Sequence, residues 1–355
     1  MSDISKIDKN FAVSEIAPGG EFYSVDEAPF VIYGVMKDEK GYYRVPQDVA
    51  DATNEGVSGL TRFTAGGIIR FSTNSKKLAI KANHAYGGVM PHMAALGSNG
   101  FSVYEDDYFL CSFFPTIPPS KVGEEKNLPY KEGVPNVDGF HDITVYMPLY
   151  GAYNDIMVKV EDGAEIRPPK KAYRNEKPVV FYGSSITEGG CASTPAMGFT
   201  NIISRDMNLY CLNLGFSGSA RGEYAINEYM ANLDMSVFVL DYDHNSPTAE
   251  YLEETHERVY KSVRATHPDI PIVIASSIPV RGWSAEYQKK RREVIFNTYK
   301  NAVEAGDKNV YFLNGEDFFS EEIPFSYCTV DGCHPNDVGM LMMAKGFEKV
   351  LVKVI

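Results

Sequence analysis

The stretch VFYGSSITEGGCA, residues 180–192, begins as an apolar run and breaks off at Gly183 into two adjacent serines. A continuous apolar run is typical of a strand that is buried on both faces, as in a parallel sheet. A serine directly after such a strand stands at the strand-to-helix turn, where the helix amino terminus stabilises negative charge. The serines are therefore either helix-capping residues, the commoner role, or include a nucleophile. The stretch by itself predicts the parallel sheet and leaves both roles open.

The chain after residue 178 repeats this rhythm of apolar runs and helical segments. Apolar runs predict five strands, at residues 179–182, 209–214, 236–241, 270–276 and 309–314. Helical segments are predicted near residues 197–207, 223–232, 248–267, 284–305 and 337–353, the last with a clear apolar stripe. This alternation predicts a doubly wound α/β domain over residues 179–355, with a flavodoxin-like sheet of five parallel strands.

The chain before residue 166 has a different rhythm, with short β-branched and aromatic runs between turn residues. They predict strands at residues 30–36, 68–75, 78–86, 100–107, 108–114, 143–150 and 155–163. No long helical period is present, so we predict an all-β sandwich of jelly-roll type over residues 1–165. The segment IRPPKKAYRNEKP, residues 166–178, is rich in proline and positive charge and predicts a linker.

Length and composition limit the possible functions. A chain of 355 residues exceeds the usual size of a single core, in agreement with two domains. The net charge of −13 argues against a nucleic-acid partner. Five scattered cysteines fit reduced thiols, and Cys328, Cys333 and His334 lack the second matching pair of a zinc site. We therefore favour small buried thiols over a metal centre.

No membrane or nucleotide partner is indicated. The opening MSDISKIDKNFAVSEI has no apolar leader segment, and no later stretch is long and apolar enough to cross a bilayer. We expect a cytoplasmic protein. The glycines after the second predicted strand lack the lysine of a phosphate-binding loop and the GxGxxG spacing, so no nucleotide cofactor is expected.

Polar residues follow the predicted strands at the edge where such sheets bind ligands. NLGFSGSA, residues 213–220, follows the second strand, and the backbone N–H of Gly218 could donate to a developing oxyanion. Asn245 follows the third strand and offers a side-chain amide to the same oxygen. Both segments could equally be plain turns. We expect the adjacent His244 to be a wall residue and not a base.

The segment VDGCHPND, residues 330–337, precedes the last predicted helix. Asp331 and His334 stand three residues apart, so the carboxylate can hold one imidazole nitrogen while the other accepts a proton. Alone, a capping aspartate and a surface histidine would be the simpler interpretation. Together with the serine, glycine and asparagine loops, however, they complete the set of groups that acyl transfer needs.

These motifs closely resemble those of the SGNH (GDSL-like) hydrolase superfamily. GSSIT resembles its nucleophile block, NLGFSG its glycine block, and DGCHPN its Asp/His block. The resemblance implies that Ser185 is the nucleophile, His334 the base and Asp331 its partner. It further implies an oxyanion hole made by the amides of Ser185 and Gly218 and the side chain of Asn245. No metal or cofactor is implied.

The first half is similar to the β-sandwich of two-domain SGNH-type esterases. GFSVY, residues 100–104, resembles a degraded copy of their Gly-x-Asp-Leu-Tyr motif. Two residues depart from the family pattern. Ser184 stands where the family commonly has Asp, which leaves the triad intact. Asp243 stands where the third block usually has Gly, and we expect it to alter the oxyanion loop or to contact substrate.

The resemblance implies a serine esterase that removes a short acyl group, with acetyl favoured, from a sugar or glycoside. The expected partner is therefore a small acylated carbohydrate. A lipid or thioester hydrolase would use the same triad, and a non-catalytic carbohydrate-binding protein is the third alternative. The segment NHAYGGVMPHM, residues 83–93, is either a loop that reaches over the active site or a buried β-hairpin.

Overall fold

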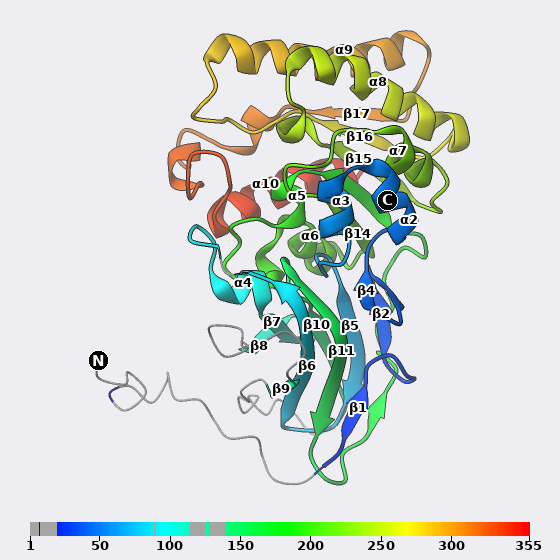
Figure 1. Ribbon diagram of the computed structural model, residues 1–355, viewed down its shortest axis with the longest axis vertical. Coiled ribbons are helices and arrows are strands. Elements are labelled where there is room, and N and C mark those ends of the chain that lie inside the picture. The colour runs from blue at the N-terminus through cyan, green and yellow to red at the C-terminus, as the bar shows by residue number, and fades with distance from the viewer. Residues whose placement is uncertain (1–6, 8–19, 89, 114–124, 128–138) are drawn as a thin grey trace.

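The structure is a computed structural model that describes residues 7, 20–88, 90–113, 125–127 and 139–355. Figure 1 shows two parts stacked along the long axis, an antiparallel sandwich and a sheet flanked by helices. Residue 89 of the segment 83–93 and residue 114 of one predicted strand lie outside the described residues.

The second part is built on five parallel strands. They are β13 (Val179–Gly183), β14 (Cys211–Gly215), β15 (Val237–Asp241), β16 (Ile272–Ala275) and β17 (Val310–Leu313). Their order in the sheet is β14-β13-β15-β16-β17, which is the flavodoxin-like order, and every pairing is parallel. Gly183 is paired with Gly215 on one side and Asp241 on the other. The loops that follow these three strands therefore start at one edge, and the predicted fold class is confirmed.

Helices cover both faces of this sheet, as the strand pattern predicts. They are α5 (Ser185–Glu188), α6 (Phe199–Met207), α7 (Tyr224–Ala231), α8 (Ala249–Thr266), α9 (Ala285–Glu304) and α10 (Asp337–Leu351). Alternate strand residues point to opposite faces: Phe181 packs in one core with α6 and α10, and Val180 in another with α7, α8 and α9. Short 3₁₀ helices occupy Pro195–Met197, Asp243–Asn245, Gly315–Phe318 and Phe325–Tyr327.

The first part is a sandwich of two antiparallel sheets. One contains β1 (Phe22–Ser24), β11 (Gly151–Val160), β6 (Leu78–Gly87) and β9 (Glu125–Asn127), in that order. The other contains β12 (Ile166–Arg167), β5 (Ile68–Thr73), β10 (His141–Tyr146), β7 (Phe101–Glu105) and β8 (Tyr108–Phe113), with β2 (Val31–Tyr33) also paired to β5. A hairpin of β3 (Met36–Asp38) and β4 (Gly41–Tyr43) lies beside them. Inward residues such as Phe71 and Ile156 form a shared core.

Three short helices interrupt the strands of the first part and were not predicted. They are α2 (Gln47–Thr53), α3 (Glu55–Leu60) and α4 (Ala95–Asn99), each of two turns or fewer. Segments this short carry no readable helical period. Ala50 and Val57 pack in the core of the parallel sheet, and Figure 1 shows α2 and α3 beside that sheet. These helices are thus part of the contact between the two halves.

The segment 166–178, predicted as a linker, is bound to both halves along its length. Its first two residues form β12 and pair with β5. The carboxylate of Asp142 accepts the backbone N–H groups of Lys170 and Lys171, each at 2.9 Å. Further along, the N–H of Arg174 donates to the carbonyl of Asn208 at 3.0 Å.

A buried ion pair joins the two halves beneath the sheet edge. Arg44 follows β4, and its Nη2 lies 2.9 Å from Oε1 of Glu188 in α5; neither side chain is exposed. Arg44 also donates to the carbonyls of Leu60 and Gly215, and its guanidinium lies 4.6 Å from the ring centroid of Phe216. One side chain of the sandwich therefore contacts the nucleophile helix and the glycine loop.

We expect Arg44→Met to lower the free energy of unfolding by about 3–5 kcal/mol, because it leaves the Glu188 carboxylate buried without a partner. Urea unfolding measures the loss. The matched control Arg167→Met removes an exposed ion pair with Glu165 and should cost less than about 1 kcal/mol. Adding Glu188→Gln to Arg44→Met should restore part of the lost stability. Equal losses in the two single variants would contradict this role.

Candidate active site

The two serines after β13 have different structural roles. Ser184 is fully buried and is the N-cap of α5, since its hydroxyl oxygen accepts the N–H of Ile186 at 3.1 Å. Ser185 is the first residue of α5 and is partly exposed. The cap and the candidate nucleophile are therefore both present, on neighbouring residues.

Ser185, His334 and Asp331 form a continuous hydrogen-bonded relay. The Ser185 Oγ lies 2.9 Å from the His334 Nε2, and the His334 Nδ1 lies 2.7 Å from the Asp331 Oδ2. The tautomer with its hydrogen on Nδ1 satisfies both contacts, because Nδ1 donates to the carboxylate and Nε2 accepts from the hydroxyl. This geometry allows the imidazole to take the proton of Ser185.

The Asp331 carboxylate is held by its own turn. Its Oδ1 accepts the backbone N–H groups of Cys333 at 2.9 Å and His334 at 2.7 Å. Burial alone would raise the pKa of Asp331, but these bonds and the His334 ring lower it to about 2. The group therefore stays ionised over the physiological pH range and fixes the orientation of the imidazole.

The predicted oxyanion donors lie on loops that are tied to the nucleophile turn. Gly218 has a φ of +65°, which a side chain would disfavour. Among the residues that the structure describes, the backbone N–H groups of Ser185 and Gly218 donate to no protein acceptor. Asn245 donates one amide hydrogen to the carbonyl of Phe216 at 2.7 Å, which leaves its second hydrogen for a ligand.

Tyr150 brings the sandwich half into the site. The predicted strand 143–150 ends at Tyr146, and the chain then leaves the sheet. The Tyr150 hydroxyl donates to the Ser185 carbonyl at 3.2 Å and lies 2.9 Å from the Ser217 Oγ. Burial raises the pKa of Tyr150 well above its usual value, so the hydroxyl stays protonated. It therefore links the nucleophile turn to the loop that carries Gly218.

The segment 83–93 takes both of its predicted forms. Residues up to Gly87 continue strand β6, whereas the part beyond it brings His92 to the triad, with its ring centroid 5.8 Å from that of His334. Gly190 lies beside the triad without room for a side chain, since a Cβ there would stand 3.0 Å from the Tyr150 hydroxyl.

One group of described side chains near the triad has metal-ligand chemistry. The ligand atoms of His92, Cys191 and His334 lie within 4.8 Å of one another. Burial raises the pKa of the Cys191 thiol to about 12, so it is not a ready thiolate. The free nitrogen of His334 is the one that faces Ser185, so an ion there would replace the hydrogen bond of the relay.

Asp243 and His244 do not face substrate or the nucleophile. Asp243 is fully buried and its Oδ1 pairs with Arg291 Nε at 2.8 Å, while its Oδ2 accepts the Ser277 N–H. Burial alone would raise the pKa of Asp243, but Arg291 and these bonds hold it below its usual value. The expected substrate contact of Asp243 is therefore wrong; it anchors the oxyanion loop. Burial lowers the pKa of His244 to about 4, and its ring stacks on Trp283.

Sequence reasoning missed four side chains that shape the site: Arg44, Glu188, Tyr150 and His92. Only Glu188 lies near a motif, three residues after the candidate nucleophile. Arg44 and Glu188 are 144 residues apart in the chain, and no local pattern relates them. Their signal was the unpaired charge of each in an apolar context.

Comparisons with known proteins agree with this fold. The chain matches the GDSL-like lipase/acylhydrolase family over residues 176–352, and the N-terminus of SGNH-hydrolase-type esterases over residues 21–166. Fold and family matches together define an ester-hydrolysing enzyme of the SGNH type. The chain belongs to the GDSL-like lipase/acylhydrolase family. Comparison with curated proteins gives no match.

Solved structures share the two-part fold. A protein described as a GDSL-like lipase from Bacteroides ovatus is 24% identical, with 95% of this chain and 98% of that chain covered and a TM-score of 0.82. The salicylyl-acyltransferase SsfX3 of a tetracycline biosynthetic pathway is 18% identical, with the same coverage and a TM-score of 0.78. An acetyl xylan esterase from Butyrivibrio proteoclasticus is 12% identical, with coverage of 94% and 98% and a TM-score of 0.58.

Two further features belong to the described part of the chain. No helix there is long and apolar enough to cross a membrane. Asp241, at the end of β15, is buried and accepts a hydrogen bond from the Thr187 hydroxyl at 2.9 Å. Burial raises the pKa of Asp241 from 3.8 to about 8. The group therefore stays largely protonated at neutral pH beneath the nucleophile helix.

We expect Asp241→Asn to remove a pH-dependent loss of stability. The unfolded chain ionises this carboxyl near pH 3.8 and the folded chain only near pH 8, so the free energy of unfolding falls as pH rises between these values. Relative to the wild type, the amide variant should therefore be more stable at pH 8 than at pH 5. Thermal unfolding at both pH values measures this.

The exposed Asp269→Asn is the matched control and should leave the pH profile unchanged. A difference between Asp241→Asn and the wild type that is the same at both pH values would contradict the raised pKa.

Proposed function

We propose that this enzyme is a serine esterase in which Ser185 is the nucleophile, His334 the general base and Asp331 its orienting partner. The relay from Ser185 Oγ to His334 Nε2 at 2.9 Å, and from Nδ1 to Asp331 at 2.7 Å, is the observation that carries this proposal. Family membership supports ester hydrolysis as the reaction class.

In the first half-reaction, Ser185 Oγ attacks the ester carbonyl carbon while His334 Nε2 takes the hydroxyl proton. The negative oxygen of the tetrahedral intermediate accepts hydrogen bonds from the N–H groups of Ser185 and Gly218 and from the Asn245 amide. As the intermediate collapses, His334 returns the proton to the departing alcohol. Water then attacks the acyl-enzyme in the same way and releases the acid.

We further propose that the substrate is a short-chain acyl ester, with acetyl favoured, of a carbohydrate. The side chains that contact the nucleophile turn and His334 include Tyr150 and His92, which are polar and suit a hydroxyl-rich alcohol better than a lipid chain. Two of the proteins with similar folds are named an acetyl xylan esterase and a family two carbohydrate esterase bound to cellohexaose. Those names support the proposal by analogy alone.

Ser185→Ala should lower kcat for p-nitrophenyl acetate by about four to six orders of magnitude, because no other group replaces the nucleophile. The neighbouring Ser184→Ala is the matched control. It removes an N-cap hydrogen bond and should cost about 1 kcal/mol of stability while most turnover remains. The assignment fails if folded Ser185→Ala retains most of the activity. Stoichiometric labelling of the wild type by a fluorophosphonate, absent in Ser185→Ala, would exclude a purely carbohydrate-binding role.

The acyl preference is tested with acetyl, butyryl and octanoyl p-nitrophenyl esters. We expect kcat/KM to fall as the chain lengthens, and a preference for octanoyl would favour the lipid acylhydrolase alternative. A panel of acetylated oligosaccharides, assayed by released acetate, then identifies the alcohol. Activity confined to acyl thioesters would contradict the carbohydrate proposal but not the role of Ser185.

A further inference from the structure

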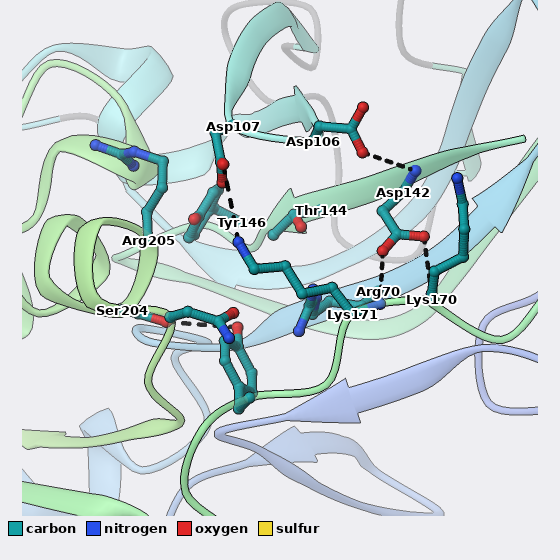
Figure 2. A pocket seen from close by; sticks show the side chains of 12 residues that line it. Arg70, Asp106, Asp107, Asp142, Thr144, Tyr146, Lys170, Lys171, Ser204 and Arg205 are labelled. Atoms are coloured by element: carbon teal, nitrogen blue, oxygen red, sulfur yellow. Dashed lines mark hydrogen bonds and ion pairs between the residues drawn. The ribbon is translucent and has the colours of Figure 1, made fainter. Parts of the chain in front are cut away.

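A second pocket lies where the sandwich meets helix α6, and no triad residue lines it. Its volume is about 280 Å³, and Figure 2 shows its lining side chains. The sandwich contributes Arg70 of β5 and Asp142 of β10, the segment 166–178 contributes Lys171 and Tyr173, and α6 contributes Arg205. The pocket is therefore closed by both halves of the chain.

Arg70 is the unusual residue of this pocket. It is only 5% exposed, and its guanidinium carbon lies 4.5 Å from the ring centroid of Tyr173. Its Nη1 is buried and has no hydrogen-bond partner among the described residues. A buried charged donor without an acceptor is costly, so the position favours a bound acceptor.

The carboxylates of the pocket do not meet this need. Asp142 accepts the backbone N–H groups of Lys170 and Lys171, and Asp107 lies 3.8 Å from the Lys171 Nζ. In the described part of the chain, none of the carboxylates forms an ion pair with Arg70. Four cationic side chains and three carboxylates line the pocket, so its formal charge is positive.

A second donor stands beside Arg70. The Tyr173 hydroxyl oxygen accepts from the Ser204 Oγ at 3.4 Å, and its own hydrogen has no acceptor in the part of the chain that the structure describes. Burial raises the pKa of Tyr173, so the hydroxyl keeps that hydrogen. A planar guanidinium next to a hydroxyl donor matches the oxygens of a carboxylate or a phosphate.

We propose that this pocket binds a small oxyanion, with Arg70 as its main ligand and the Tyr173 hydroxyl as a second donor. The volume limits the ligand to about the size of a monosaccharide, below most drug-sized sites. Because both halves of the chain line the pocket, a bound anion stabilises their docking and raises the melting temperature. The site is independent of the proposed esterase mechanism.

Thermal unfolding with increasing sodium phosphate or sodium glucuronate tests the proposal, with sodium chloride at matched ionic strength as the reference. We expect a saturable rise in melting temperature with at least one of the two anions. The tighter anion distinguishes a phosphate ligand from a carboxylate ligand. The same rise in Ser185→Ala is expected, since that variant changes the proposed nucleophile only.

Arg70→Met should weaken the affinity about tenfold or more, because it removes the charged donor. The matched control Arg167→Met changes an exposed arginine outside the pocket and should retain the wild-type affinity. If Arg70→Met does not fold, Tyr173→Phe removes only a hydroxyl and should weaken the affinity about threefold or more. The proposal is overturned if neither anion gives a saturable rise, or if Arg70→Met, or Tyr173→Phe in its place, binds as tightly as the wild type.

Discussion

The ion pair between Arg44 and Glu188 is the constraint on which the geometry of the active-site loops depends. Both groups are fully buried, and desolvation of two charges costs several kcal/mol unless further hydrogen bonds compensate. Those bonds are present: Arg44 donates to the Gly215 carbonyl, and Glu188 Oε2 accepts the Ser217 N–H at 2.9 Å. The nucleophile helix and the glycine loop therefore share one buried charge pair.

The sandwich is consequently part of the active site and not a separate appendage. Arg44 supports the loops from below, and Tyr150 contacts both the Ser185 carbonyl and Ser217. His92 adds a third contact, against the ring of His334. Rigid positioning of this kind suits oxyanion stabilisation, because donors that are already oriented need no reorganisation when charge develops.

The two departures from the family pattern have local structural explanations. Ser184 retains the capping function of a short polar side chain at the start of α5. Asp243 pairs with Arg291, which is fully buried and lies 4.5 Å from the Trp283 ring, and thereby fastens the oxyanion loop to α9. The order of strands, the helices of the second half and the motif positions were predictable, because each depends on local periodicity or on a single turn.

The sequence by itself determined the parallel sheet, the sandwich and the candidate residues at the strand ends, since apolar period and turn residues are read within a few positions. Only the tertiary structure decided that Ser184 caps while Ser185 faces His334, that Asp243 is an anchor, and that Arg44 and Tyr150 complete the site. The tertiary structure alone also brings Arg70 and Tyr173 together, more than a hundred positions apart in the chain. Such contacts depend on burial and charge pairing between distant segments, which no local pattern encodes.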